Sequence, residues 1–188
     1  MIELVIDYLN NKISTELGYY KNTFGLCEII NKEESEFPAF YNKGDYKKVL
    51  DFDKQFSTLY YRINGAIQTI TIEDELPIYL QQKNYPIKIV SVVRKNILKN
   101  QKNNEYIDDL ISSNLSNVII GSYSQFARDN KLESLFVNTS SISLDRKSIL
   151  SNELKIKELK FPYEWSIVTI DINIVISEYK KCFNNITC

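Results

Sequence analysis

The chain has 188 residues, with 23 basic and 24 acidic side chains and no histidine. Hydrophobic residues make up 44% of it and charged residues 25%, a balance typical of a folded globular protein. The formal net charge of −1 gives no electrostatic case for binding a polyanion over a broad surface. The lack of histidine excludes mechanisms that need an imidazole base or a histidine-ligated metal.

The N-terminus and the cysteines indicate where the protein folds. Glu3 and Asp7 stand where a secretory signal needs a basic region and an apolar core, and no apolar run approaches the roughly 18 residues of a membrane-spanning helix. Cys27, Cys182 and Cys188 lack metal-ligand spacing. Free thiols are favoured, with a Cys182–Cys188 bridge as the alternative. We therefore expect a protein that folds in a cytoplasm and carries no metal or cofactor.

The patterns predict one α+β domain over residues 1–188, with a mostly antiparallel sheet and helices packed on one face. The expected elements follow in chain order: an N-terminal helix over about 2–17, a β-rich middle over about 23–93, a helical or loop insertion over about 100–152 and a closing strand over about 165–177.

The first helix is predicted by apolar residues at three- and four-residue spacing, with Gly18 where a left-handed C-terminal cap is expected. These residues are Ile2, Val5, Ile6, Leu9, Ile13 and Leu17. A strand over about 24–30 follows. The segment Phe37–Tyr41 is predicted as an edge strand or a strand start, because Pro38 cannot donate to a ladder.

A hairpin is predicted in the middle of the chain. Asn64-Gly65 lies between the β-rich runs Leu59–Ile63 and Ala66–Ile72, and a type I′ turn needs positive φ at both central residues. A bulged continuous strand is the alternative. Ile87–Val93 is apolar on both faces, which predicts a central strand covered by helices on at least one side.

The second half of the chain predicts a loop, a helix and two strands. The basic run Arg94–Lys102 is expected to be a loop, and apolar spacing from Tyr106 to Leu115 predicts a second amphipathic helix. Leu135–Val137 is a candidate strand. The clearest pattern is a strict alternation near the C-terminus, which predicts a long half-buried strand with Trp165 as a core anchor. Its apolar row is Val168, Ile170, Ile172, Ile174 and Ile176.

The sequence offers little catalytic chemistry. Glycine-rich phosphate loops and a G-x-S-x-G motif are absent from it, and the run Arg94–Lys102 lacks the interleaved aromatic residues that stack on bases. A hydrolase or nuclease built on carboxylates would be chemically possible, although acidic residues in turns are ordinarily there for solvation. We expect a protein that is not an enzyme. The acidic residues available to the alternative are Asp51, Asp53, Glu73 and Asp74.

Tyrosine is abundant, with 13 residues, and Tyr60 and Tyr61 are adjacent in a predicted strand. Neighbouring strand residues point to opposite faces, so one ring is expected to be wet or covered by another chain. Tyrosine is enriched in protein–protein interfaces. The pair therefore gives some support to an interaction surface, with ordinary use in the core and rim as the stronger alternative.

The order of short motifs resembles small virion proteins of tailed phages. The similarity is to neck and tail-completion (tail-terminator-like) proteins of phages that infect Bacteroidetes, including crAss-like phages. The motifs that carry it are Phe37–Tyr41, Tyr60–Gly65, Tyr85–Val90, Leu144-Asp145-Arg146 and Phe161–Trp165.

The resemblance implies a six- or twelve-fold homo-oligomeric ring at the head–tail junction, joining portal or adaptor proteins to the tail. DNA would pass through the ring without specific binding, no membrane would be involved, and no catalytic residues are implied. The protein would reside in the virion neck or tail after assembly in the host cytoplasm. The segment 100–152 is longer than a minimal tail-completion domain requires.

A ring contact joins one patch to a different patch, and extended arms or exposed sheet edges supply such contacts. Phe37–Tyr41 and the segment after Ile176 are the candidate arms. Two other function classes stay open: a carboxylate-metal hydrolase or nuclease of a mobile element, and a monomeric inhibitor or immunity-type module. The predicted assembly residues are Phe37, Phe40, Tyr41, Tyr60, Tyr61, Tyr179 and Phe183.

Overall fold

Two long strands form the centre of the molecule. In this computed structural model, β7 (Ile78–Arg94) and β10 (Trp165–Lys181) pair antiparallel over their whole length. The structure describes residues 1–32, 35–50, 57–73, 78–98, 106–156 and 164–181. Both predicted strands are confirmed, and both extend beyond their predicted limits because β7 continues through Pro86 and β10 follows it as far as Lys181.

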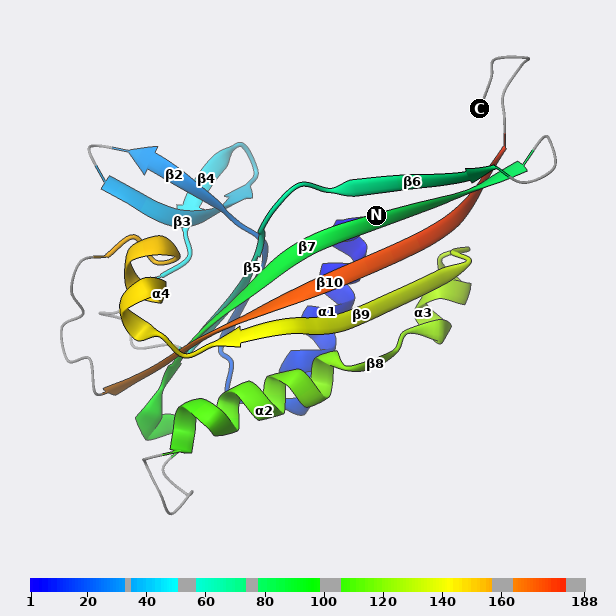
Figure 1. Cartoon of the computed structure of the whole chain (residues 1–188). Helices are drawn as coiled ribbons and strands as arrows, with labels where there is room; N and C mark the ends of the chain where they lie inside the picture. The colour runs from blue at the N-terminus through cyan, green and yellow to red at the C-terminus, as the bar shows by residue number, and fades with distance from the viewer. Residues whose placement is uncertain (33–34, 51–56, 74–77, 99–105, 157–163, 182–188) are drawn as a thin grey trace.

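The strands around this pair complete a mixed, mostly antiparallel sheet (Figure 1). Its order is β1-β5-β7-β10-β9-β8, and β6 pairs with β7 beyond the end of β5. The pair β1–β5 is parallel, whereas the other strand pairs of this sheet are antiparallel. The bounds are β1 (Asn22–Leu26), β5 (Thr58–Ile63), β6 (Gln68–Glu73), β8 (Gly121–Ser122) and β9 (Ser134–Ser143). The predicted α+β class is confirmed.

The predicted hairpin at Asn64-Gly65 is wrong. β5 and β6 both pair with β7, Ile63 opposite Ile87 and Gln68 opposite Asn84, so they lie end to end along one strand. The residues between them stand opposite Tyr85-Pro86, and Pro86 has no N–H to offer a continuous neighbour. Gly65 has φ +147°, and a Cβ there would lie 3.3 Å from the Pro86 ring. The alternative, a bulged continuous strand, has the direction of the chain right, but the structure has two separate strands there.

Three helices cover one face of the sheet, which we call the first face. They are α1 (Ile2–Glu16), α2 (Ile107–Ile119) and α3 (Ser124–Asp129). The apolar stripe of α1 and the row of β10 meet there, and both are buried. The first helix is thus confirmed, but the expected cap is not: α1 ends at Leu17 with φ −118°, and Gly18 does not have a positive φ.

The other, second face is partly covered by α4 (Arg146–Asn152) and a three-stranded antiparallel sheet (Figure 1). The side chain of Asp145 caps α4, accepting from the backbone N–H groups of Lys147 (3.2 Å) and Ser148 (3.4 Å). Trp165 is 3% exposed and packs in this layer, as predicted. The small sheet contains β2 (Glu28–Lys32), β3 (Ser35–Asn42) and β4 (Asp45–Lys48).

Two local predictions about the first strands of the chain are wrong. The strand expected over 24–30 is divided between β1 and β2, which belong to different sheets. β3 was expected at an edge because of Pro38, yet it is the central strand of the small sheet. Pro38 lies opposite Ile29 of β2, just beyond the last β3–β4 pair, so its missing N–H interrupts neither ladder.

The basic run after β7 begins with a short 3₁₀ helix, η1 (Lys95–Leu98), where a loop was expected. The remainder of that run lies outside the described residues. None of the helices in the described ranges is both long and apolar enough to cross a membrane.

Candidate assembly interface

The predicted interface residues lie in three separate places. Phe37, Phe40 and Tyr41 belong to β3 of the small sheet, and Tyr179 lies near the end of β10. Figure 1 shows these two sites at opposite ends of the main sheet. Tyr60 and Tyr61 are in the centre of β5, and Phe183 lies outside the described residues. The structure therefore does not bring the predicted residues together into one patch.

Tyr60 and Tyr61 are both fully buried within the chain, so the expectation that one ring would be wet or covered by a partner is wrong. Tyr61 packs in the first-face core and Tyr60 in the second-face core, because both faces of the sheet are covered at this point. The Tyr60 hydroxyl donates to the Glu153 carbonyl oxygen at 3.1 Å. Burial raises the pKa of both phenols above the usual range, so both rings are neutral core residues.

The aromatic residues of the small sheet are already in contact with neighbouring side chains of the same chain. Phe40 packs against Phe24 with ring centroids 4.9 Å apart, and the Lys48 ammonium lies 5.5 Å from the centre of the Phe37 ring. Tyr41 is 64% exposed, but its ring meets Tyr46 edge-on at 5.3 Å. This end of the molecule offers one exposed aromatic pair.

The other end of the sheet extends beyond the layers that cover it. There β6, β7 and β10 run side by side, and β9 flanks β10 (Figure 1). Directly opposite residues of antiparallel strands share a face. Ile72 lies opposite Leu80, and Leu80 lies opposite Tyr179, so these three side chains form one row across the second face.

Two further pairs extend this row. Ile70 lies opposite Gln82, and Val175 lies opposite Phe136, again on the second face. Four of these apolar side chains are exposed: Ile70 by 53%, Ile72 by 50%, Phe136 by 59% and Tyr179 by 53%. We call this surface the distal face, and its apolar residues are Ile70, Ile72, Leu80, Phe136, Val175 and Tyr179.

Beyond the core residue Ile176, the opposite side of the same strands is mostly polar. Thr71 lies opposite Gln81, and Gln81 lies opposite Glu178, while Thr69 lies opposite Lys83. A sheet section with one polar and one apolar surface is the pattern of a half-buried sheet. Within the described residues no layer covers the distal face, and exposed apolar surface of this kind marks interaction sites.

The outer edge of this section is β6. Among the described residues it pairs with β7 alone, so the backbone groups on its other side have no strand partner. Of the distal-face residues, sequence reasoning named Tyr179 alone. The alternation of Ile70 and Ile72 with threonine was visible in the sequence. The predicted hairpin, however, paired this run with Leu59–Ile63, so a free edge was not expected there.

A second feature missed by sequence reasoning is a charged cluster on the second face. The Glu153 carboxylate accepts from Arg62 at 2.6 Å and from Lys88 at 2.9 Å, and Lys88 also lies 3.8 Å from Asp171. Asp171 accepts from the Asn64 side-chain amide at 2.9 Å. Two cations and two carboxylates balance in charge. Since Glu153 follows α4, the cluster fastens that helix to the sheet.

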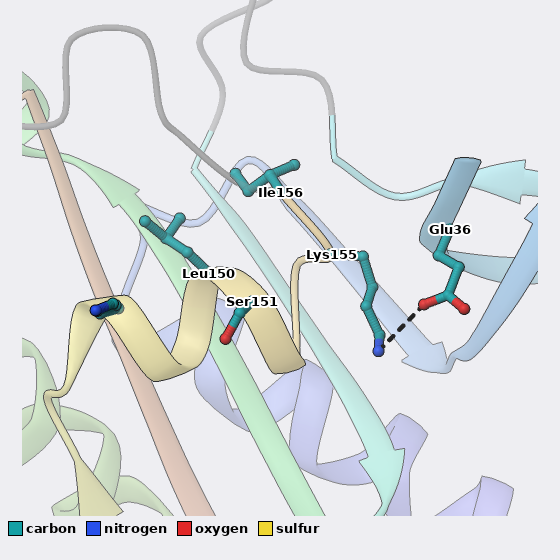
Figure 2. A pocket seen from close by; sticks show the side chains of 6 residues that line it. Glu36, Leu150, Ser151, Lys155 and Ile156 are labelled. Carbon is teal, nitrogen blue, oxygen red and sulfur yellow. Dashed lines mark ion pairs between the residues drawn. The ribbon is translucent and has the colours of Figure 1, made fainter. Parts of the chain in front are cut away.

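An open hollow of about 440 Å³ lies between α4 and the small sheet (Figure 2). Lys155 and Glu36 form an ion pair across it at 3.2 Å, and the Ser151 hydroxyl donates to the Ser148 carbonyl oxygen. Three of its polar lining groups, those of Glu36, Ser151 and Lys155, thus already have partners within the chain. Leu150 and Ile156, which also line it, pack against the second-face core.

Most of the acidic residues considered for a metal site lie outside the described residues. Asp51, Asp53 and Asp74 lie beyond the described residues, and Glu73 is the last residue of β6. In the part of the chain that the structure describes, no three His, Cys, Asp or Glu side chains gather closely enough to share a metal ion. Cys27 is buried, and burial raises the pKa of its thiol to about 12.

Neither a protein-family model nor a curated protein matches this chain.

Proposed function

We propose that this chain is a non-enzymatic structural protein that works by associating with copies of itself and with neighbouring chains. The distal face carries this proposal. It presents Ile70, Ile72, Phe136 and Tyr179, each at least half exposed, on one side of an extension of the main sheet. Apolar surface in this arrangement is stabilised when another protein covers it.

The resemblance to neck and tail-completion proteins suggests where in a virion such a protein would assemble. Small neck and tail-completion proteins of tailed phages form rings, so we place the chain in a six- or twelve-fold ring at the head–tail junction or upper tail. There it would join portal or adaptor to tail around the DNA channel, in a virion assembled in the host cytoplasm. The formal net charge of −1 suits a wall along which DNA slides.

The test is the solution mass and shape of the purified full chain. We expect light scattering to give a mass several times 22.0 kDa and negative-stain images to show closed rings. Replacing Tyr179 with serine is expected to lower that mass. The control is Tyr106→Ser, which removes a ring that is 61% exposed and lies outside the distal face, and it is expected to leave the mass unchanged.

The competing classes give different results. A metal-dependent enzyme would show saturable Mg²⁺ or Mn²⁺ binding, and its turnover would disappear in an Asp51→Asn or Asp53→Asn variant. An inhibitor module would stay a single chain and bind a partner one to one. Either result would overturn the proposal.

A further inference from the structure

The edges of the two sheets are protected to different degrees. At the β1 edge α1 packs against the strand, and the Asn10 side-chain amide donates to the Phe24 carbonyl oxygen at 3.2 Å. At the opposite edge of the main sheet, β8 pairs with Phe136 and Val137 of β9, and α2 contacts β9. These contacts pair or cover edge N–H and C=O groups that could otherwise bind another β-strand.

The small sheet protects its edges with charge. β4 contains Asp45, Lys47 and Lys48, and β2 begins with Glu28 and ends with Lys32. Charged residues, lysine above all, discourage the addition of a strand.

β6 has none of these protections. Its sequence, Gln-Thr-Ile-Thr-Ile-Glu, holds no proline, glycine or lysine, and its one charge is Glu73 at the end. Its β-branched residues have a high preference for strands. Its outer side has no strand partner among the described residues, and Figure 1 shows no helix beside it. The group that satisfies such an edge is another β-strand.

We infer that β6 pairs antiparallel with β6 of a second copy of this chain, about a two-fold axis at Thr71. A two-fold axis perpendicular to the joined sheet keeps the distal faces of both copies on one side. In this register Ile70 lies opposite Ile72 of the second copy and Thr71 lies opposite its own equivalent. The distal faces then join into one continuous apolar surface.

The self-complementary sequence selects this register. Moving the axis by one residue, to Ile70, would set Ile72 opposite Gln68 and leave one isoleucine pair, that of Ile70 with its own equivalent, in place of two. With the axis at Thr71, β-branched residues meet on both faces, and such cross-strand pairs stabilise a sheet. Thr69 then stands opposite Glu73, so no like charges meet. Two-fold contacts are also the commonest symmetry of soluble oligomers.

This inference does not depend on a place in a virion. A two-fold contact joins chains in pairs, whereas a closed ring needs head-to-tail contacts between different patches. Pairing through β6 would cover the free edge whether or not the chain also forms head-to-tail contacts. The two proposals can therefore fail separately.

The test introduces one cysteine at a time into the full chain with Cys182 and Cys188 replaced by serine; Cys27 is kept because it is buried. Opposite residues of antiparallel strands have Cα atoms about 4.5–5.5 Å apart, inside the range of a disulfide. Thr71→Cys is therefore expected to form a covalent pair under mild oxidation. Thr69→Cys is the matched control on the same edge and face. Its equivalents would be four residues out of register, about 13 Å apart, and should not cross-link.

A second variant tests the edge without cysteine chemistry. Ile70→Lys places a charge on the exposed strand, where a folding defect is not expected because Ile70 is 53% exposed. Because the two-fold contact is lost, we expect the mass to fall to half that of the wild-type chain at equal concentration, with an unchanged melting temperature. Absence of cross-linking in Thr71→Cys, equal cross-linking in Thr69→Cys, or a pair that persists in Ile70→Lys would each overturn the inference. Turnover of a substrate would overturn the proposed function and leave the cross-link unaffected.

Discussion

Two buried tyrosines show how differently the same hydroxyl can act. Tyr20 and Ser91 share a hydrogen bond of 2.7 Å inside the first-face core, where both residues are almost completely buried. The hydroxyl of Tyr61, fully buried nearby, has no hydrogen-bond partner among the described residues. Buried polar groups are costly when unpaired and contribute to stability when paired. Removing the two hydroxyls should therefore have opposite consequences.

We expect Tyr20→Phe to lower the free energy of unfolding by about 1–2 kcal/mol, because it leaves the Ser91 hydroxyl buried without its partner. Tyr61→Phe keeps the ring and removes a group that already lacks a partner, so stability should stay equal or increase. Urea unfolding of the two variants measures both effects. Equal losses in the two variants would contradict this explanation.

The thiol of Cys27 makes stability depend on alkaline pH. Burial raises its pKa from an ordinary value of 9.0 to about 12. As the pH rises past 9, the unfolded chain releases this proton before the native chain does, so the native state loses stability until the pH reaches about 12. We expect a loss of about 1 kcal/mol between pH 8 and pH 10, with less loss in Cys27→Ala. The free energy of unfolding of both proteins is measured by urea unfolding at each pH. An equal loss in wild type and Cys27→Ala would contradict the assignment to this thiol.

At the scale of elements, α4 depends on contacts far away in sequence. The Glu153 carboxylate that follows it binds Arg62 and Lys88 on two neighbouring strands. Removing one partner from a mostly buried ion cluster leaves uncompensated charge, so Glu153→Ala should lower the free energy of unfolding by about 3 kcal/mol. Glu36→Ala breaks the more exposed pair with Lys155 and should cost less than about 1 kcal/mol. Chemical denaturation gives the free energy of unfolding of both variants. Similar losses would show that the Glu153 cluster contributes no more to stability than the exposed Glu36–Lys155 pair.

The sequence predicted the elements whose signals are local. The strict alternation from Val168 to Ile176 and the helical spacing after Ile2 each describe one face of one element, and both are confirmed. The division of the first strand into β1 and β2 could not be predicted, because it depends on which distant strand each half joins. The same holds for the hairpin, where pairing with β7 at Pro86 prevailed over the preference of Asn64-Gly65.

The candidate interface was predictable only in part for a related reason. Tyr179 was named from its residue type, but the distal face exists because Ile72, Leu80 and Tyr179 come into register from three strands. Tyr60 and Tyr61 have the same residue type and are buried, since layers from distant parts of the chain cover both faces there. Residue type alone did not separate these two outcomes.

At the scale of the whole molecule, charge limits what the surface can bind. With 23 basic and 24 acidic residues, the chain has no excess of positive charge with which to displace counterions from DNA. We expect duplex DNA to bind more weakly than about 10⁻⁴ M at 0.15 M salt, measured by the fluorescence anisotropy of a labelled duplex. Micromolar affinity that falls steeply with added salt would refute this expectation.

The position of β10 in the chain also determines when the molecule can fold. Every strand and helix that β10 joins precedes it in sequence, and its isoleucine row completes the first-face core. While the ribosome is still translating, the earlier segments therefore lack the strand that holds them together. The native structure forms only once this last segment has left the exit tunnel, so chaperones that bind nascent chains have a long interval in which to act.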